Sequence, residues 1–150
     1  MHDKDIAILR QLAANGRISL NDLGEAVGLS PTPTARRVKH LEAAGVITGY
    51  YASLDETALG FPVSVFVSVR LDKQIDEALA LFEAAVARLP EVVDCWLMTG
   101  NRDYLMRVAT RDLADYERFL TQRLNKIKGV ASIESSIPLR RVKATPARIP

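Results

Sequence analysis

Residues 30–40 hold the side chains whose types and spacing best suit binding chemistry. Three short hydroxyl groups are followed by two arginines, a lysine and a histidine in the run SPTPTARRVKH. Short hydroxyls can reach base edges and phosphates, and arginine can form paired hydrogen bonds with guanine or with phosphate. The residues that we predict to contact double-stranded DNA are Ser30, Thr32, Thr34, Arg36, Arg37, Lys39 and His40.

The element that must position these side chains is the stretch Ser19–Gly45, which reads as two short helices around a tight turn. Ser19 is a suitable N-cap for the first helix, and Gly28 can adopt the positive φ that a sharp turn between helices often needs. Ser30 and Thr32 are both plausible N-caps of the second helix. Each precedes a proline, which suits a first helical turn, so the sequence leaves the choice of cap open.

The second helix has an apolar side, because Ala35, Val38 and Leu41 recur every three residues. The cations then project outward, as in a helix-turn-helix whose second helix enters the DNA major groove. If Arg37 reads a base, replacing it by alanine should weaken DNA binding by about 1–3 kcal/mol. The alternative is a small helical domain with a basic, solvated face.

The flanking sequence completes a small N-terminal domain. Asp3–Ala14 has helical apolar spacing, and Val46–Leu54 is rich in β-branched and aromatic residues, which predicts a strand or wing. The polar residues after Leu54 predict a connector. We therefore expect a DNA-binding domain over residues 1–54, a linker over 55–60 and a second domain over 61–150.

The second domain shows both kinds of periodicity. From Pro62 to Leu71 apolar and other residues alternate, as in a strand with one buried face, and a helical stripe follows over Ile75–Leu89. The remaining predicted elements are strands over Glu91–Thr99 and Asp103–Thr110, a helix over Leu113–Leu124 and a strand over Val130–Leu139. The β-α-β-β-α-β order predicts an α+β chain with a ferredoxin-like second domain, both helices covering one sheet face.

The other face of the predicted sheet carries Phe66, Trp96, Met98 and Tyr104, which are large groups for a solvated surface. Exposed apolar area of this kind commonly marks self-association. The alternative is that the N-terminal domain or the C-terminal tail covers this face.

Composition narrows the function classes. One cysteine and two distant histidines provide no disulfide, no catalytic triad, no metal site and no recognisable cofactor motif. With no apolar run of membrane-spanning length and no signal peptide, we expect a cytoplasmic protein without membrane contact. A small enzyme built on the second domain is therefore the least favoured of three hypotheses.

Several motifs in order resemble the Lrp/AsnC family of transcription regulators. They are Asp5–Leu9, Gly16–Ile18, Leu29–Glu42, Gly45–Tyr50 and the hairpin Thr99–Tyr104. The resemblance implies a winged helix-turn-helix that binds DNA as part of a dimer, and a βαββαβ domain that pairs sheet to sheet, with dimers commonly forming octamers.

The resemblance also implies an amino-acid effector, bound between regulatory domains near the hairpin. The residues that it proposes are Gly100, Asn101, Arg102, Asp103, Tyr104 and Ser135. A turn presents backbone N–H groups to a carboxylate, and Asp103 could meet an α-ammonium group. The leading hypothesis is therefore an effector-responsive transcription regulator, and the alternative is an architectural DNA-binding protein without an effector.

Overall fold

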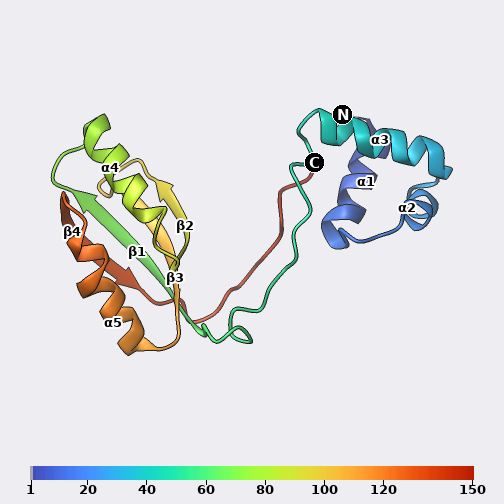
Figure 1. The fold of residues 1–150 in the computed structure, drawn as a ribbon. Helices are drawn as coiled ribbons and strands as arrows, with labels where there is room; N and C mark the ends of the chain where they lie inside the picture. Colours follow the sequence, from blue (N-terminus) through green and yellow to red (C-terminus); the bar gives the residue numbers. More distant parts are fainter. Residues whose placement is uncertain (1) are drawn as a thin grey trace. The chain divides into compact units, whose positions relative to one another are not determined.

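A computed structural model describes residues 2–150 as two compact units (Figure 1). The helical unit comprises the residues up to Ser53 together with Val142–Pro150, and the sheet unit comprises Leu54–Arg141. Residues 55–60, which we expected to be a linker, belong to the sheet unit, and Arg107 donates two hydrogen bonds to Glu56 there. We expected the tail from Val142 to be part of the second domain, but its contacts place it in the helical unit.

The helical unit contains three helices: α1 (Asp3–Ala14), α2 (Leu20–Val27) and α3 (Pro31–Ala43). Ser19 caps α2 as predicted, with its hydroxyl accepting a hydrogen bond from the Asp22 N–H. Gly28 ends α2 with φ +67°, which confirms the predicted left-handed turn. Ser30, rather than Thr32, is the N-cap of α3, and Pro31 occupies its first turn.

The apolar side of α3 differs by one position from our prediction. Thr34, Val38 and Leu41 are buried, whereas Ala35 is only partly buried. A strict three-residue repeat drifts around a helix of 3.6 residues per turn, so spacings of four and three keep side chains on one face. Val38 and Leu41 are therefore confirmed as core residues, and Thr34 takes the place predicted for Ala35.

Of the two forms predicted for Val46–Leu54, a strand or a wing, the strand is wrong, because no residue of this segment is in a strand. Its β-branched and aromatic composition supports an extended chain, but a strand also requires a neighbour that pairs with its backbone groups. The chain provides no such neighbour within its described residues. Tyr51 and Leu54 are instead strongly exposed.

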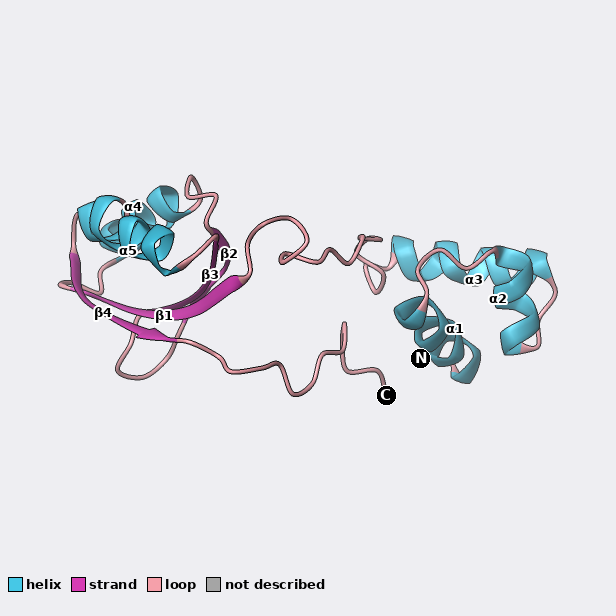
Figure 2. Ribbon diagram, turned by 90° about the horizontal axis from the view of Figure 1, so that it is seen from below, coloured by secondary structure: helices cyan, strands magenta, loops and turns pink. Residues whose placement is uncertain are grey.

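The sheet unit has the predicted βαββαβ order. Its elements are β1 (Val63–Leu71), α4 (Asp76–Val86), β2 (Val92–Leu97), β3 (Tyr104–Thr110), α5 (Leu113–Gln122), the short 3₁₀ helix η1 (Leu124–Lys126) and β4 (Val130–Ser136). The four strands are antiparallel in the order β2-β3-β1-β4. Figure 2 shows α4 and α5 on the same side of this sheet. The ferredoxin-like arrangement is confirmed.

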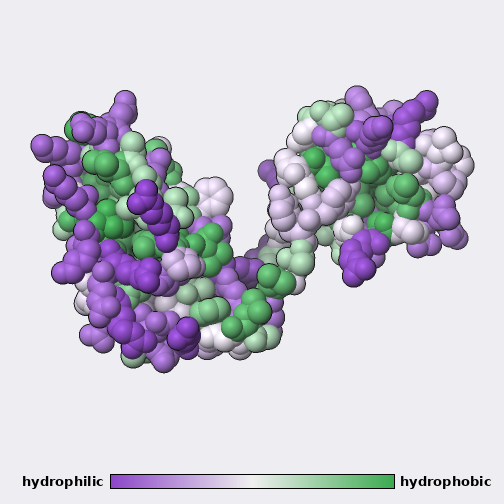
Figure 3. Space-filling view, viewed as in Figure 1, coloured by the Kyte–Doolittle hydropathy of each residue, from purple (hydrophilic) through white to green (hydrophobic). Residues whose placement is uncertain are grey.

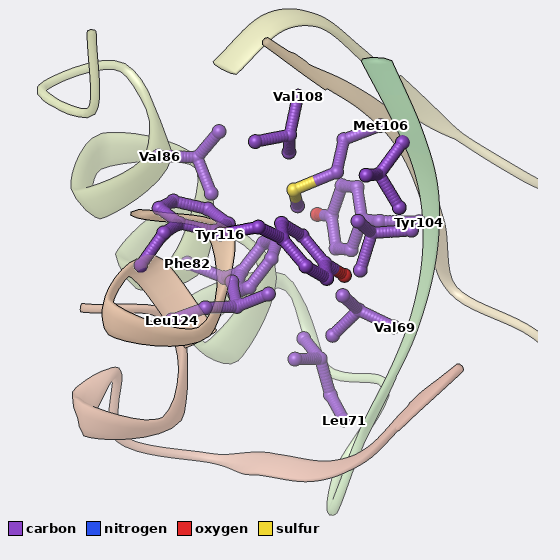
Figure 4. Packing of buried hydrophobic residues seen from close by; sticks show 12 residues of the cluster. Val69, Leu71, Phe82, Val86, Tyr104, Met106, Val108, Tyr116 and Leu124 are labelled. Carbon is purple, nitrogen blue, oxygen red and sulfur yellow. The ribbon is translucent and has the colours of Figure 1, made fainter. Parts of the chain in front are cut away.

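The core of the sheet unit lies between the sheet and its two helices (Figure 4). As predicted, the alternate β1 residues Val65, Val67, Val69 and Leu71 face this core, where each is at most 3% exposed. Phe82 from α4 stacks on Tyr104 from β3, with ring centroids 4.5 Å apart. This packing fixes the start of β3, and with it one end of the preceding hairpin, to the core.

The outer face of the sheet carries three of the four large groups predicted there. Phe66, Trp96 and Met98 are 38%, 61% and 38% exposed. The prediction that Tyr104 lies on the outer face is wrong. Its cross-strand partner is Val69, which faces the helices, and paired residues share a face. Figure 3 shows the opposite side of this unit, where α4 and α5 lie in front of the sheet, and there apolar (green) and hydrophilic (purple) groups are interspersed.

No helix within residues 2–150 combines the length and the apolar character that crossing a membrane requires.

Candidate functional site

The outer side of α3 carries most of the residues predicted to contact DNA. Ser30, Thr32, Arg36, Lys39 and His40 are all exposed. Thr32, Arg36 and His40 are four residues apart and so lie along one face of the helix. The Ser30 hydroxyl makes no capping hydrogen bond with the helix. The arrangement places hydroxyl groups at the start of the helix and positive charge further along it.

The prediction that Thr34 contacts DNA is wrong, because that role requires an exposed side chain. Its side chain is fully buried, and its hydroxyl donates to the Ser30 carbonyl at 2.9 Å. This residue packs α3 onto the core, where it cannot reach a DNA base or phosphate.

Arg37 is also held by the protein itself. Its Nη1 donates to Asp5 Oδ1 at 2.8 Å, and its side chain is 30% exposed. Arg37 follows buried Thr34 by three positions and precedes buried Leu41 by four, so it leaves the helix at the edge of the core. It is therefore not the freely projecting cation that we predicted.

Three residues that position α3 were not identified from the sequence. Gly24 lies where α2 and α3 approach each other, and a Cβ there would lie 2.7 Å from the Leu29 carbonyl oxygen. Lys4 Nζ donates to the Val27 carbonyl at 2.5 Å, and Asp5 holds Arg37. A glycine inside a helix is the one signal that was visible, because it costs helix stability without a packing reason.

The predicted effector residues centre on the hairpin between β2 and β3. Gly100 has φ +100°, and nothing lies within 4 Å of the position of a Cβ there. The hairpin is held at the end of β1, because the Asp103 N–H donates to the Val69 carbonyl at 2.9 Å. One Asp103 carboxylate oxygen accepts from the Leu71 N–H at 2.6 Å. The Asp103 side chain therefore supports the hairpin before any ligand is considered.

Arg102 and Asn101 provide the accessible polar groups of this hairpin. Arg102 Nη1 donates to the Ser68 hydroxyl at 2.8 Å, and Asn101 is exposed. Ser68 pairs in register with Glu134 of β4, which brings a carboxylate onto the same sheet face. Neither Ser68 nor Glu134 was singled out from the sequence, because only strand register brings them near the hairpin.

Two predicted effector residues lie instead on the helix-covered face of the sheet, Tyr104 buried and Ser135 exposed. The Tyr104 hydroxyl donates to Glu83 Oε1 at 2.7 Å, and burial together with this carboxylate raises the pKa of Tyr104. Ser135 pairs in register with Val67 and is hydrogen-bonded to the Tyr116 hydroxyl of α5. The structure therefore brings Gly100 to Asp103 together on one hairpin but places Ser135 across β1 from it.

Other reactive groups and hollows do not add a catalytic arrangement. Burial raises the pKa of the Cys95 thiol to about 11, and Glu83 contributes, so the thiol is protonated at neutral pH. No group of three potential metal ligands occurs among residues 2–150. A hollow of about 910 Å³ in the helical unit, between the end of α1, residues 46–53 and residues 146–150, includes none of the predicted site residues.

Comparison with known families matches both parts of the chain. Residues 1–48 match the family described as winged helix-turn-helix DNA-binding, and residues 64–148 match the Lrp/AsnC ligand binding domain. Only residues 49–63 and the last two residues lie outside these two matches.

Among curated relatives, the Bkd operon transcriptional regulator of Pseudomonas aeruginosa is 51% identical over 138 residues, which are 92% of this chain and 90% of the relative. The leucine-responsive regulatory protein of Haemophilus influenzae is 40% identical over 94% of this chain and 85% of its own length.

Solved structures agree with these relatives. A transcriptional regulator from Neisseria meningitidis in complex with L-methionine superposes with a TM-score of 0.92 at 34% identity, covering 97% of this chain and 94% of its own. An AsnC family regulator from Agrobacterium tumefaciens gives a TM-score of 0.91 at 36% identity, covering 99% and 96%.

Proposed function

Because the chain belongs to the Lrp/AsnC family of transcription regulators, we propose which of its residues contact DNA and which bind an effector. The DNA contacts are assigned to the exposed side of α3, namely Ser30, Thr32, Arg36, Lys39 and His40. The observation that carries this assignment is the exposure of Arg36 and Lys39 on α3, the helix that follows the Gly28 turn. The protein acts on DNA in the cytoplasm.

One recognition helix contacts few base pairs, so we propose that the protein binds DNA as a dimer or a larger assembly. Two copies of α3 related by a two-fold axis would read an inverted repeat. The exposed apolar groups on the outer sheet face, Phe66, Trp96 and Met98, support self-association. Light scattering measures the mass of the assembly, and a monomer at micromolar concentration would contradict this part of the proposal.

A selection experiment tests the DNA contacts. Duplexes enriched by the protein from a random-sequence pool serve as the probe, and fluorescence anisotropy measures the affinity over a range of salt concentrations. Arg36→Ala and Lys39→Ala should each weaken binding and, where the lost contact is to phosphate, lower the salt slope by about 0.9. Arg111→Ala removes an exposed cation of the sheet unit and is the matched control. Unchanged affinity in both α3 variants would exclude this face.

We further propose that the effector is an amino acid, bound at the hairpin Gly100–Asp103. The open space at Gly100 allows close approach of a ligand, and Arg102 and Asn101 offer polar groups there. A related regulator was crystallised with L-methionine, and another is named for its response to leucine, which favours an apolar side chain.

A thermal-shift screen with the twenty amino acids and with D-leucine and D-methionine tests the effector. A ligand that binds the native state raises the melting temperature. Arg102→Ala should reduce this rise while DNA affinity without an amino acid is unchanged. If no amino acid raises the melting temperature, the architectural alternative without an effector is favoured.

A further inference from the structure

The first turn of α1 contacts both helices of the helix-turn-helix through consecutive residues. Lys4 Nζ donates to the carbonyl of Val27, the last residue of α2. The neighbouring Asp5 accepts from Arg37 in the middle of α3. Terminal helix carbonyls lack partners within their own helix, so the Lys4 contact satisfies a group that would otherwise need water. The first turn of α1 therefore helps to set the orientation of α2 and α3.

The ion pair between Asp5 and Arg37 leaves most of the arginine free. Asp5 uses one carboxylate oxygen for Arg37 Nη1, at 2.8 Å, and its other oxygen accepts from the His2 backbone N–H at 3.2 Å. A guanidinium group has five N–H donors, of which this contact engages one. Burial would raise the pKa of Asp5, but the Arg37 and His2 hydrogen bonds outweigh it and lower the pKa.

A second arginine of the chain, Arg107, uses more of its N–H donors than Arg37 does. Arg107 donates to both oxygens of Glu56, at 2.7 and 3.0 Å, and also lies 3.7 Å from Asp94. Its side chain is 15% exposed, half the value of Arg37. Paired geometry of this kind consumes the donors of an arginine. Arg37, with one contact and a side chain 30% exposed, keeps donors for another partner.

We propose that Asp5 is a positioning residue for DNA binding, which holds Arg37 at the edge of α3 so that its remaining N–H groups meet a DNA phosphate. The inference rests on the proposed function of α3. An arginine that is already fixed loses less side-chain entropy when it binds than a freely rotating one. Arg37 then supplies a phosphate contact, which orients the helix, while the exposed α3 residues read the bases.

Four variants test this role against the selected duplex. Arg37→Ala should weaken binding on the order of tenfold and lower the salt slope by about 0.9, as expected for one lost phosphate contact. Asp5→Ala should weaken binding by a similar factor, because the arginine is no longer positioned. The double variant should bind no more weakly than Arg37→Ala alone, since both changes remove the same contact. Asp5→Asn should weaken binding less than Asp5→Ala, because the amide oxygen still accepts from Nη1, although the amide NH2 group cannot accept from the His2 N–H as the second carboxylate oxygen does.

Controls separate positioning from simple support of the fold. Lys4→Ala removes the neighbouring contact with α2 and leaves the Asp5–Arg37 pair intact, and unfolding is measured for every variant. If Lys4→Ala weakens binding as much as Asp5→Ala, the role of Asp5 is only structural, and the proposal is overturned. Tighter binding by Asp5→Ala would overturn it as well, because Asp5 would then be withholding Arg37 from DNA. Absence of binding by the unaltered protein would instead contradict the proposed function.

Discussion

The two units differ in how many of their predicted site residues already contact other parts of the chain. In the helical unit five of the seven predicted DNA-contacting side chains remain exposed, and only Thr34 and Arg37 are engaged. In the sheet unit four of the six predicted effector residues already make side-chain hydrogen bonds with other parts of the chain, namely Arg102, Asp103, Tyr104 and Ser135. A large partner such as DNA needs an exposed surface, whereas a small ligand needs a framework that is shaped in advance.

The two units also differ in the size of their hydrophobic cores. Five buried hydrophobic residues form the core of the helical unit, and twelve form that of the sheet unit. The helical unit adds polar contacts between its helices, through Lys4 and Asp5. The sheet unit relies on aromatic and aliphatic packing behind the hairpin. Mutations should therefore affect the two units separately and by different mechanisms.

Phe82→Ala should have the largest effect. Phe82 is fully buried and stacks on Tyr104, so its removal leaves a cavity that should destabilise the sheet unit by about 3–5 kcal/mol. Trp96, the one tryptophan of the chain, lies in β2, so its fluorescence follows unfolding of this unit in urea. Leu81→Ala, at a neighbouring position that is 59% exposed, is the control and should have a small effect. Equal effects of the two changes would contradict the assigned core.

Gly24→Ala should be the matching test in the helical unit. The added Cβ would lie 2.7 Å from the Leu29 carbonyl oxygen and 3.0 Å from Thr34 Oγ1, so α2 and α3 must separate. Overpacking of this kind costs about 1–3 kcal/mol, which should exceed the roughly 1 kcal/mol that alanine gains over glycine in a helix. Helical circular dichroism and DNA affinity should both fall, while Trp96 fluorescence reports an unchanged sheet unit.

The control for this change is Gly16→Ala. The nearest atoms to a Cβ at Gly16 lie at 3.7 and 3.8 Å, which is ordinary contact. A stable Gly24→Ala variant that binds DNA normally would show that the close approach of α2 to α3 is not required.

Glu56→Gln should have a smaller and pH-dependent effect on the sheet unit. The Arg107 hydrogen bond lowers the pKa of Glu56, and burial opposes this shift only in part. A carboxyl group with a lowered pKa contributes stability above its unfolded pKa, and this contribution is lost as the pH falls through the folded pKa. The variant should therefore be less stable by about 1–2 kcal/mol at pH 7 and should approach the unaltered protein as the pH falls below the ordinary glutamate pKa and through the lowered pKa of Glu56.

Urea unfolding followed by Trp96 at several pH values measures this convergence. Glu134→Gln, a change at an exposed carboxylate of β4, is the control. A difference between Glu56→Gln and the unaltered protein that persists at low pH would assign the effect to packing rather than to charge.

The contrast between the units also explains what the sequence could predict. The alternation in Val63–Leu71 and the helical stripes are local signals, so the fold of the sheet unit followed from them. The pairs Asp5–Arg37 and Ser68–Arg102 join residues 32 and 34 positions apart, and no local pattern reveals them. The predicted strand at Val46–Leu54 failed for the same reason, since a strand depends on a partner that local composition does not specify.

Tyr104→Phe is the finest test of the framework behind the hairpin. Burial and the hydrogen bond to Glu83 raise the pKa of Tyr104. The variant keeps the ring against Phe82 and loses only the hydroxyl, and Glu83 is exposed enough to be hydrated instead. The loss at neutral pH should therefore be about 0.5–1.5 kcal/mol, the net value of one hydrogen bond.

The alkaline behaviour of this variant distinguishes the hydrogen bond from the ring packing. A group whose folded pKa is raised contributes stability fully below its unfolded pKa, about 10 for tyrosine, and the contribution is lost as the pH rises further. The unaltered protein should lose stability above about pH 10, whereas Tyr104→Phe should lose less, so their difference should shrink. Cys95 and Tyr116, whose pKa values are also raised by burial, remain in both proteins and cancel in the comparison. A constant difference up to pH 11 would mean that the Tyr104 hydroxyl is not held in the core, and the hairpin would then be less rigidly supported than its contacts indicate.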